Sequence, residues 1–422
     1  MTNNIPQLRF PEFYGQWGEK QLGNIGEYIG GGTPDTSVKE YWQGEIPWIS
    51  SSDVFDDSIH KIDKTRYITK EAVEKSATKI VPKGSVLMVS RVGIGKFAIA
   101  DEELCTSQDF TNLVTSENEY FLGYYFKTKA NRFVSLSQGT SIKGFTTKDI
   151  KSAKFNIPDP PEQTKIADFL TAVDKRINLL EEKKKALEKY KKGVMQKVFD
   201  GQWVKVDGQL KFQPPTILFK NEDGNDFPDW EEKKLGDLGK TFNGLTGKTK
   251  VDFGEGKPYI QYMQIFRSSK LDVSDFGLVN IKDGENQSQA QYGDVFFTTS
   301  SETPKEIGIS SVLTEQVKEV YLNSFCFGYR PNCLDELVPE FAQFFFRSEK
   351  VRKQIVKLAQ GSTRFNMSKV ALLKLKFDFP EKDEQQKIAD FLSSIDKLIE
   401  KVDRQINLSQ EWKKGLLQKM FV

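Results

Sequence analysis

The chain has 422 residues, of which 38% are hydrophobic and 28% are charged, and its 61 basic and 59 acidic side chains leave a net charge of +2. Two or three domains are expected at this length, each large enough to bury a core. Neither the first residues, MTNNIPQLRF, nor any later stretch carries the apolar run of a signal peptide or a membrane span, so we expect a cytoplasmic protein with no membrane partner.

Composition also narrows the possible catalytic sites. Cys105, Cys326 and Cys333 show no CxxC spacing, so neither a disulfide framework nor a zinc ribbon is supported. His60 is the only histidine, and we interpret it as an ordinary surface residue rather than a base or a metal ligand. The nearly even charge balance neither indicates nor excludes a nucleic-acid partner, because phosphate binding depends on where lysine and arginine cluster.

Residues 1–155 are predicted to form a first globular head that is rich in strands. The stretch SVLMVSRVG (85–93) carries β-branched and apolar residues bounded by glycine, as strands do. This pattern does not predict the order of the strands.

Residues 156–200 are predicted to form one long helix. Prolines 158, 160 and 161 mark its start, because proline is tolerated only around the first turn. Positions stepping by four and three residues form the a/d seam of a coiled coil over five heptads. These positions are Ile166, Leu170, Val173, Ile177, Leu180, Lys184, Leu187, Lys191, Val194 and Val198.

A linker over 201–216 then leads to a second strand-rich head over 217–379. Its stretch DVFFTTSS (294–301) is typical of a strand, and FAQFFFRSEKVRKQIVKLAQ (341–360) is predicted to be a helix.

The last segment, 380–422, repeats the first helix. At an offset of 222 residues, 158–199 pairs with 380–421 without a gap, and 18 of the 42 positions are identical. The fronts of the heads, WGEKQLGNIG (17–26) and WEEKKLGDLG (230–239), also match, so the chain is a tandem duplication of a head followed by a helix. The second seam comprises Ile388, Leu392, Ile395, Ile399, Val402, Ile406, Ser409, Lys413, Leu416 and Met420.

The length of the helices predicts how they pack. A helix of about 38 residues is about 57 Å long, so parallel packing would stretch the linker almost fully. We therefore predict an α+β fold in which two pseudo-symmetric, mixed, strand-rich globular domains are separated by two long antiparallel coiled-coil helices. A rigid rod with unlike heads at its two ends suits a DNA duplex, whose turn of about 34 Å separates half-sites on one face.

Three stretches superficially resemble catalytic motifs. DPPE (159–162) has Glu162 where the loop of amino-methyltransferases needs an aromatic residue, and it is predicted to be the turn that starts the helix. GLTGKT (244–249) and VGIGKF (92–97) lack the first glycine of a phosphate-binding loop and are predicted to link strands.

The chain resembles the specificity subunit of a type I DNA restriction-modification enzyme over nearly its whole length. The resemblance is carried by the EQ-KIADFL openings of both helices, the W-x-x-x-x-L-G fronts of both heads, and QGTS (138–141) with QGST (360–363). It implies that the heads are target recognition domains, that the helices are conserved spacer regions, and that the bound sequence is bipartite with a non-specific gap.

The resemblance further implies a non-catalytic subunit that holds no cofactor or metal of its own. Two methyltransferase subunits and two restriction/translocase subunits would bind around it and use S-adenosylmethionine, ATP and Mg²⁺. An alternative is a tandem coiled-coil adaptor that joins proteins without touching DNA, and a third possibility is an autonomous methyltransferase or nuclease. Polar, glycine-flanked loops at equivalent positions of both heads favour the DNA-binding subunit.

Base reading needs amide, hydroxyl or guanidinium groups on loops, and phosphate binding needs lysine and arginine. In the first head these groups are Ser50, Ser51, Ser52, Ser90, Arg91, Lys96, Gln108, Thr140, Ser141 and Lys143. In the second head they are Gln261, Tyr262, Gln264, Thr298, Thr299, Ser300, Asn323, Ser362, Thr363, Arg364 and Asn366.

The lysine clusters of the helices allow two interpretations. Most of these lysines suit a solvated helix face, while Lys184, Lys191 and Lys413 fall on the seam, where a polar residue sets the register. The sharper hypothesis is that the pairs 191–192 and 413–414 contact phosphates of the DNA spacer.

Overall fold

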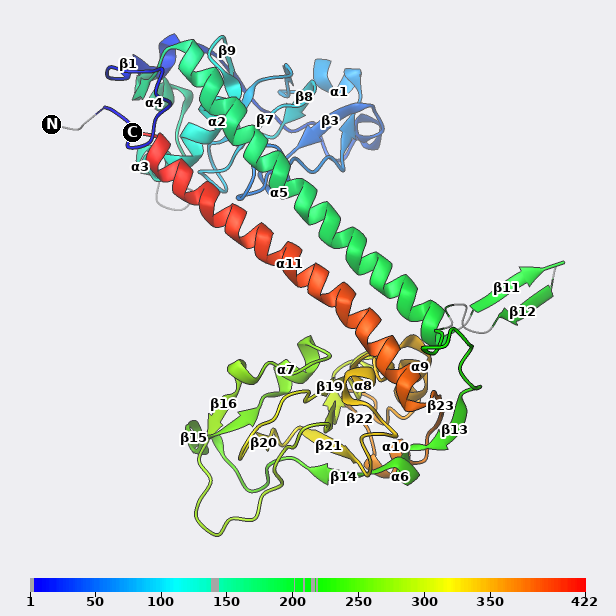
Figure 1. Cartoon of the computed structure of the whole chain (residues 1–422). Coiled ribbons are helices and arrows are strands. Elements are labelled where there is room, and N and C mark those ends of the chain that lie inside the picture. The colour runs from blue at the N-terminus through cyan, green and yellow to red at the C-terminus, as the bar shows by residue number, and fades with distance from the viewer. Residues whose placement is uncertain (1–3, 138–143, 201, 208, 214–216, 218) are drawn as a thin grey trace. The chain divides into compact units, whose positions relative to one another are not determined.

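The structure is a computed structural model that describes residues 4–137, 144–200, 202–207, 209–213, 217 and 219–422 (Figure 1). The chain divides into two compact units, one formed by residues 1–182 with 403–422 and the other by residues 183–402. Each unit holds one head together with parts of both long helices. No helix among the described residues is long and apolar enough to cross a membrane.

The first unit is built on two four-stranded sheets. In one sheet every neighbouring pair is antiparallel, in the order β2 (Gly26–Gly30), β9 (Phe110–Thr115), β6 (Val86–Val89) and β7 (Phe97–Ile99). The other has the order β4 (Tyr67–Ile68), β3 (Ile46–Ile49), β8 (Leu104–Thr106) and β5 (Ile80–Val81), and its β3–β8 pair is parallel. The remaining elements are the antiparallel pair β1 (Gly18–Gln21) and β10 (Lys154–Ile157), with α1 (Lys70–Glu74), α2 (Glu119–Thr128), α3 (Ala130–Leu136) and α4 (Thr147–Ser152).

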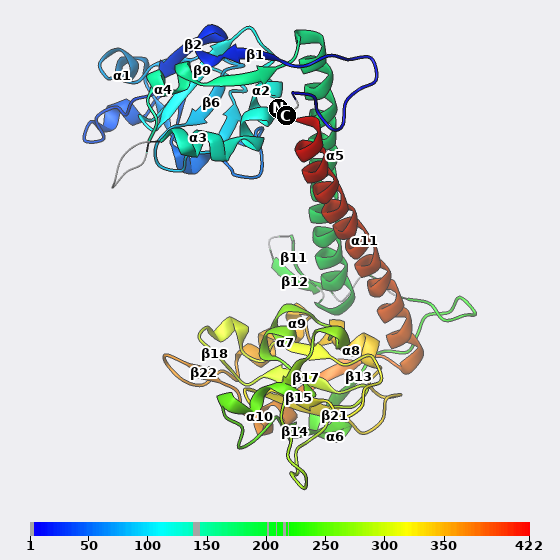
Figure 2. The same cartoon turned by 90° about the vertical axis from the view of Figure 1, so that its left-hand side faces the viewer.

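The second unit repeats this plan with different details (Figure 2). Its antiparallel sheet has the order β14 (Gly239–Asn243), β21 (Cys326–Pro331), β17 (Val295–Thr298) and β19 (Ser310–Val312). A three-stranded sheet has the order β16 (Gly277–Val279), β15 (Phe253–Ile260) and β20 (Tyr321–Leu322), and its β15–β20 pair is parallel. The remaining elements are β13 (Glu231–Lys234) with β23 (Lys376–Phe379), β18 (Ser300–Ser301) with β22 (Phe365–Asn366), α6 (Leu235–Leu238), α7 (Tyr262–Arg267), α8 (Pro339–Phe345), α9 (Glu349–Val356) and α10 (Lys369–Leu373).

Two segments differ from the sequence-based expectation. The segment 341–360, predicted as one helix, contains two, because Ser348 has an extended backbone and its side chain caps α9 by accepting a hydrogen bond from the amide of Val351. The predicted linker carries a hairpin of β11 (Gln202–Val206) and β12 (Gln209–Gln213).

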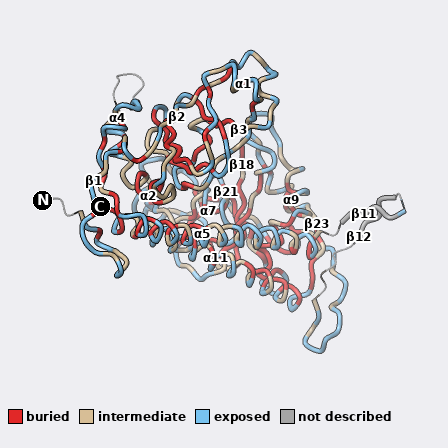
Figure 3. Tube along the Cα trace, turned by 90° about the horizontal axis from the view of Figure 1, so that it is seen from above, coloured by how far each residue is buried: buried red, intermediate tan, exposed pale blue. Residues whose placement is uncertain are grey.

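Both predicted long helices are present, as α5 (Pro160–Met195) and α11 (Lys382–Met420). Every predicted seam position on the two helices is buried or half-buried, and every exposed residue of the helices lies off the seam (Figure 3). In the first unit, Ile166, Leu170 and Val173 of α5 share one core with Leu416 and Met420 of α11. In the second unit, Val194 of α5 and the first turns of α11 belong to one core with the second head.

The repeated Glu-Gln motif, Glu162-Gln163 in α5 and Glu384-Gln385 in α11, joins each helix to its own head. The indole Nε1 of Trp17 donates to Glu162 over 3.3 Å, and Trp230 donates in the same way to Glu384 over 3.0 Å. The motif therefore explains why the tryptophan fronts of the heads recur together with the helix starts.

The glutamine of the motif binds the start of a helix in each head. The Oε1 atom of Gln163 accepts from the amide of Asn118 over 3.0 Å, and that of Gln385 accepts from the amide of Val338 over 2.9 Å. Asn118 and Val338 are the capping residues that precede α2 and α8. Each glutamine thus fixes the orientation of a long helix to the corresponding helix of the head.

The two glutamates of the motif have different partners: an arginine binds Glu162, whereas a neutral indole donates to Glu384. The guanidinium of Arg9 donates from Nε and Nη2 to the carboxylate of Glu162, both over 2.7 Å. Glu384 is 4% exposed and accepts from Trp230, and burial raises its pKa to about 7. Because the pKa of Glu384 falls toward its ordinary value of 4.5 on unfolding, its burial lowers the stability of the folded chain as the pH rises from about 4.5 through 7.

We therefore expect Glu384→Gln to raise the stability of the chain at pH 8 by about 1 to 2 kcal/mol and to have little effect at pH 4.5, where the wild-type side chain is protonated. The matched substitution Glu162→Gln removes the charge that Arg9 binds and should lower stability at pH 8 by about 1 to 3 kcal/mol. Urea unfolding of both variants at the two pH values measures this contrast. Equal effects of the two substitutions at pH 8 would contradict the assignment.

Candidate nucleic-acid interface

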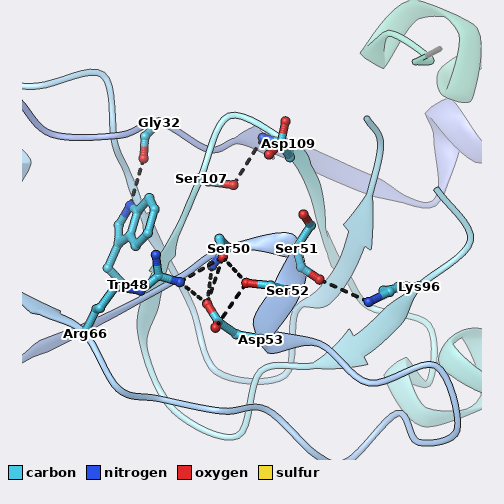
Figure 4. A network of polar contacts seen from close by, with 10 residues as sticks. All are labelled: Gly32, Trp48, Ser50, Ser51, Ser52, Asp53, Arg66, Lys96, Ser107 and Asp109. Atoms are coloured by element: carbon cyan, nitrogen blue, oxygen red, sulfur yellow. Dashed lines mark hydrogen bonds and ion pairs between the residues drawn. The ribbon is translucent and has the colours of Figure 1, made fainter. Parts of the chain in front are cut away.

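A parallel strand pair sets the position of the predicted reading loops in the first head. Trp48 of β3 pairs with Cys105 of β8, and Ile49 pairs with Thr106. Because the carboxyl ends of parallel strands meet at one edge, the turn 50–53 and the turn 107–109 leave the sheet side by side (Figure 4).

The turn after β3 is held by a buried carboxylate. The backbone amide and hydroxyl of Ser50 donate to Asp53 over 2.7 and 3.0 Å, which closes a capping box around a 3₁₀ turn. Arg66 donates from Nη2 to Ser50 Oγ over 2.8 Å and also to the carboxylate of Asp53. The ion pair stabilises the turn, and the hydroxyl of Ser52 remains on its exposed side, 2.8 Å from Ser50 Oγ.

Aromatic and basic side chains tie this turn to the rest of the edge. The guanidinium carbon of Arg66 lies 4.6 Å above the ring of Trp48, whose indole donates to the carbonyl of Gly32 over 2.9 Å. Lys96 donates to the carbonyls of Ser51 and Val54 over 3.4 and 3.1 Å. The loop that follows β6 is thereby joined to the turn that follows β3.

The second head repeats this edge with other side chains. Tyr259 pairs in parallel with Tyr321, and a capping box closes at the start of α7, where the amide of Gln261 donates to Gln264 over 3.1 Å. Gln261 and Gln264 stand where the first head has Ser50 and Asp53. The same local device therefore supports the loop after the same strand in both heads.

A cleft of about 400 Å³ lies beside this edge in the second head. It brings together the predicted residues Tyr262, Ser300 and Arg364 with the 55% exposed side chain of Phe325. The hydroxyl of Tyr262 donates to the carbonyl of Ser300 over 3.0 Å, and the guanidinium carbon of Arg364 lies 5.7 Å from the ring of Phe325. The cleft combines an aromatic face with a guanidinium.

Four predicted reading residues are buried: Ser300, which lines the cleft, and Ser90, Thr298 and Gln264, which are bonded within the heads. The hydroxyl of Ser90 donates to the carbonyl of Asp109 over 3.1 Å, and that of Thr298 accepts from the amide of Ile309 over 3.0 Å. The side-chain amide of Gln264 donates to the carbonyl of Asp272 over 3.2 Å. In this structure these three side chains support the loops and do not reach the surface.

The other predicted residues occupy several environments. Asn323 caps its own turn by accepting from the amide of Phe325 over 2.8 Å, and Gln108 accepts from the hydroxyl of Thr33. Thr140, Ser141 and Lys143 lie outside the described residues. The exposed members are Ser52, Arg91, Gln108, Ser362, Thr363, Arg364 and Asn366, and the half-buried ones are Ser50, Ser51, Lys96, Gln261, Tyr262, Thr299 and Asn323.

Four residues that hold or line these loops were not among the predicted DNA-binding residues. Asp53 and Arg66 hold the first turn, and Phe325 and Met263 line the second cleft. Asp53 could have been found from the S-x-x-D spacing of a capping box. Arg66 had no such signal, because its contact depends on the pairing of β3 with β4.

The prediction that His60 is an ordinary surface residue is wrong. Its Nε2 atom lies 2.7 Å from the hydroxyl of Tyr124, which donates to Asp174 over 2.7 Å. Lys413 forms an ion pair of 2.5 Å with the same carboxylate. His60 therefore belongs to a polar cluster that joins the first head to both helices within the first unit.

Two of the three seam lysines, Lys191 and Lys413, contact aspartates. Lys413 binds Asp174 in the first unit, and Lys191 binds Asp396 over 2.5 Å in the second. These contacts agree with the register interpretation and leave Lys191 and Lys413 less suited to phosphates than the sharper hypothesis requires. Within the described part of the chain, no group of three or more Cys, His, Asp or Glu side chains is arranged to hold a metal ion.

The chain is similar in sequence to known proteins. Residues 14–189 and 228–409 each match the family model described as "Type I restriction modification DNA specificity domain". The specificity subunit of the type I restriction enzyme MjaIX of Methanocaldococcus jannaschii is 31% identical over 306 residues, which cover 70% of this chain and 69% of that protein. The MjaVIII specificity subunit of the same organism is 25% identical and covers 93% of this chain and 88% of its own length.

A solved structure has a similar fold. The S subunit of a type I restriction-modification system from M. genitalium matches with a TM-score of 0.56 at 15% identity, covering 99% of both chains.

We expect Arg66→Ala to speed amide hydrogen exchange in residues 50–54, because Asp53 would remain buried without its cation. Arg66→Lys should restore part of the protection, since it supplies charge without the second donor. Exchange measured by mass spectrometry tests this, with Arg91→Ala as the control for loss of an exposed arginine. Unchanged exchange in Arg66→Ala would show that the turn does not depend on the ion pair.

Proposed function

The chain belongs to the family of type I restriction-modification DNA specificity subunits, and on that premise we propose that each of its heads binds one half of a bipartite double-stranded DNA target. The proposed target recognition domains span residues 1–155 and 217–379. The proposed spacer helices span 156–200 and 380–422, and 201–216 links the two halves.

One observation carries this proposal. Both heads present the loop after the same strand at an edge formed by a parallel pair, and both support it with a capping box. The residues that follow the box position differ, with Ser51 and Ser52 in the first head and Tyr262 and Met263 in the second. Two heads that bind different half-sites need loops held in the same way but carrying different exposed side chains.

We propose that α5 and α11 pair as an antiparallel coiled coil that fixes the separation of the half-sites. The repeat offset of 222 residues relates Asp174 to Asp396 and Lys191 to Lys413. The ion pairs Asp174–Lys413 and Lys191–Asp396 are therefore two copies of one contact, as a two-fold axis between antiparallel helices requires. This equivalence supports a single register along both helices.

The proposed subunit is non-catalytic and acts as a scaffold. Two methyltransferase subunits and two restriction/translocase subunits would bring S-adenosylmethionine, ATP and Mg²⁺. A solved structure that matches at 17% identity and a TM-score of 0.56, covering 96% of both chains, comes from work on "complex assembly" of a type I system. The adaptor alternative offers no reason for unlike polar edges on equivalent supports.

Genome-wide mapping of methylated adenines tests this function. The chain is expressed with the methyltransferase encoded beside it in a host that lacks adenine methylation. The expected result is a single motif with two specified parts and an unspecified gap. An unmethylated genome despite an intact complex, or methylation by the purified chain alone, would overturn the proposal.

The cleft of the second head predicts which half of that motif depends on it. Phe325→Ala and Arg364→Ala should relax or abolish one half of the motif and leave the other half unchanged, because aromatic and guanidinium groups contact base edges and methyl groups. Arg91→Ala, in the first head, serves as the matched control and should affect the opposite half or only the overall affinity. Loss of both halves together in the second-head variants would contradict independent reading.

A further inference from the structure

A second cleft lies in the first unit, away from the reading edge. Its volume is about 760 Å³, and its lining comes from residues 57–61, the end of α2, the middle of α5 and the last turns of α11. Five lysines line it, together with three carboxylates. The charges in this cleft do not cancel.

Two of the five lysines are neutralised within the protein. Lys413 forms its ion pair with Asp174, and Lys61 lies 3.4 Å from Glu181. Lys127, Lys129 and Lys414 also line the cleft, and none of the three has a hydrogen bond or ion pair from its ammonium group to another described residue. Asp57 is the remaining carboxylate in the lining. The cleft therefore holds an excess of positive charge.

Lys127 is half-buried, so its positive charge is poorly solvated in the cleft. Burial, together with the neighbouring charge of Lys413, lowers the pKa of Lys127 to about 8, against the attraction of Asp57, Asp174 and Asp56. Burial also lowers the pKa of Lys129, with a contribution from Arg132. A half-buried ammonium group without a partner is stabilised when an anion enters beside it.

The corresponding cleft of the second unit, of about 690 Å³, provides a comparison. Its lining includes Glu340, Asp390 and Glu400, and Glu400 stands at the repeat position of Asn178 in the first cleft. Its Arg347 donates to the carbonyls of Ile265 and Ser268, both over 2.7 Å. Its lining holds five cationic and four anionic side chains, one carboxylate more than the first cleft, so its excess of positive charge is smaller.

The first cleft adjoins a predicted DNA-reading loop. Gly95, in the loop that contains Arg91 and Lys96, lies so close to Ala130 that a β-carbon on it would be 3.2 Å from the methyl group of Ala130. Ala130 directly follows Lys129. The chain segment that carries Lys129 therefore lies next to the loop that carries Arg91 and Lys96.

We propose that the first-unit cleft binds phosphate groups of the DNA backbone next to the half-site of the first head, through Lys127, Lys129 and Lys414. This inference rests on the proposed function. Flexible ammonium groups act as point charges toward phosphate and carry no base preference. The cleft would add affinity without sequence information beside the half-site of the first head.

The test compares the salt dependence of DNA binding by the full chain in complex with its methyltransferase. The variant Lys127→Gln/Lys129→Gln/Lys414→Gln should reduce the slope of log K against log salt by about 2 to 3, since each lost phosphate contact removes about 1. It should weaken binding to the target duplex and to a random duplex by similar factors and leave the methylated motif unchanged. The control Lys70→Gln/Lys79→Gln/Lys83→Gln removes three exposed lysines of the same unit outside the cleft and should change the slope less.

Protection from lysine labelling gives a second readout on the wild-type protein. A short duplex should slow acetylation of Lys127 and Lys129 and leave Lys79 and Lys83 unaffected. An unchanged salt slope together with no protection would overturn the inference. Loss of methyltransferase binding with an unchanged slope would instead assign the cleft to an acidic protein segment, and failure of the wild-type complex to bind any duplex would overturn the proposed function itself.

Discussion

The structure depends most on one polar contact that the repeat places in an apolar seam. Asp174 binds Lys413 and Asp396 binds Lys191, with exposed side-chain fractions of 11% and 14% for the first pair and 29% and 21% for the second. A partly buried ion pair adds little net stability, because desolvation offsets its attraction. In the proposed antiparallel coiled coil, an aspartate that faced leucine or isoleucine in a shifted register would be costly, so the pair disfavours such registers. In that proposal, the contact selects the orientation of the helices and adds little to the strength of their association.

The side chains around this ion pair differ between the two units. The contacts that join each head to its long helix are nearly the same in both units. Asp174 also accepts from Tyr124, next to His60, whereas Lys191 lies 5.0 Å from the ring of Phe344 in the second unit. At the joints, a tryptophan, a glutamate and a glutamine make equivalent bonds in both halves. The parts that hold heads to helices have stayed alike while the exposed edges have diverged. In the proposed function, this is the division between geometry and sequence reading.

Sequence reasoning succeeded where side-chain periodicity determines the outcome. The seam positions of both helices are buried or half-buried because an a/d pattern places them on one face. It was less successful in the loops, since position along the chain does not reveal which way a side chain points. Ser90 follows β6 and Thr298 is the last residue of β17, and both side chains turn inward. The role of His60 and the break before α9 depend on partners distant in sequence or on one capping hydroxyl, so no local pattern predicted them.

Thermal unfolding of charge-reversal variants tests the central claim most directly, at Asp396 and Lys191, where no tyrosine hydroxyl or histidine complicates the exchange. Asp396→Lys alone would place two lysines together, and Lys191→Asp alone two aspartates. The account predicts that each single variant lowers Tm by several degrees and that the double variant recovers most of the loss. A double variant as unstable as the two single losses combined would show that these side chains do not face each other, and the single antiparallel register would be wrong.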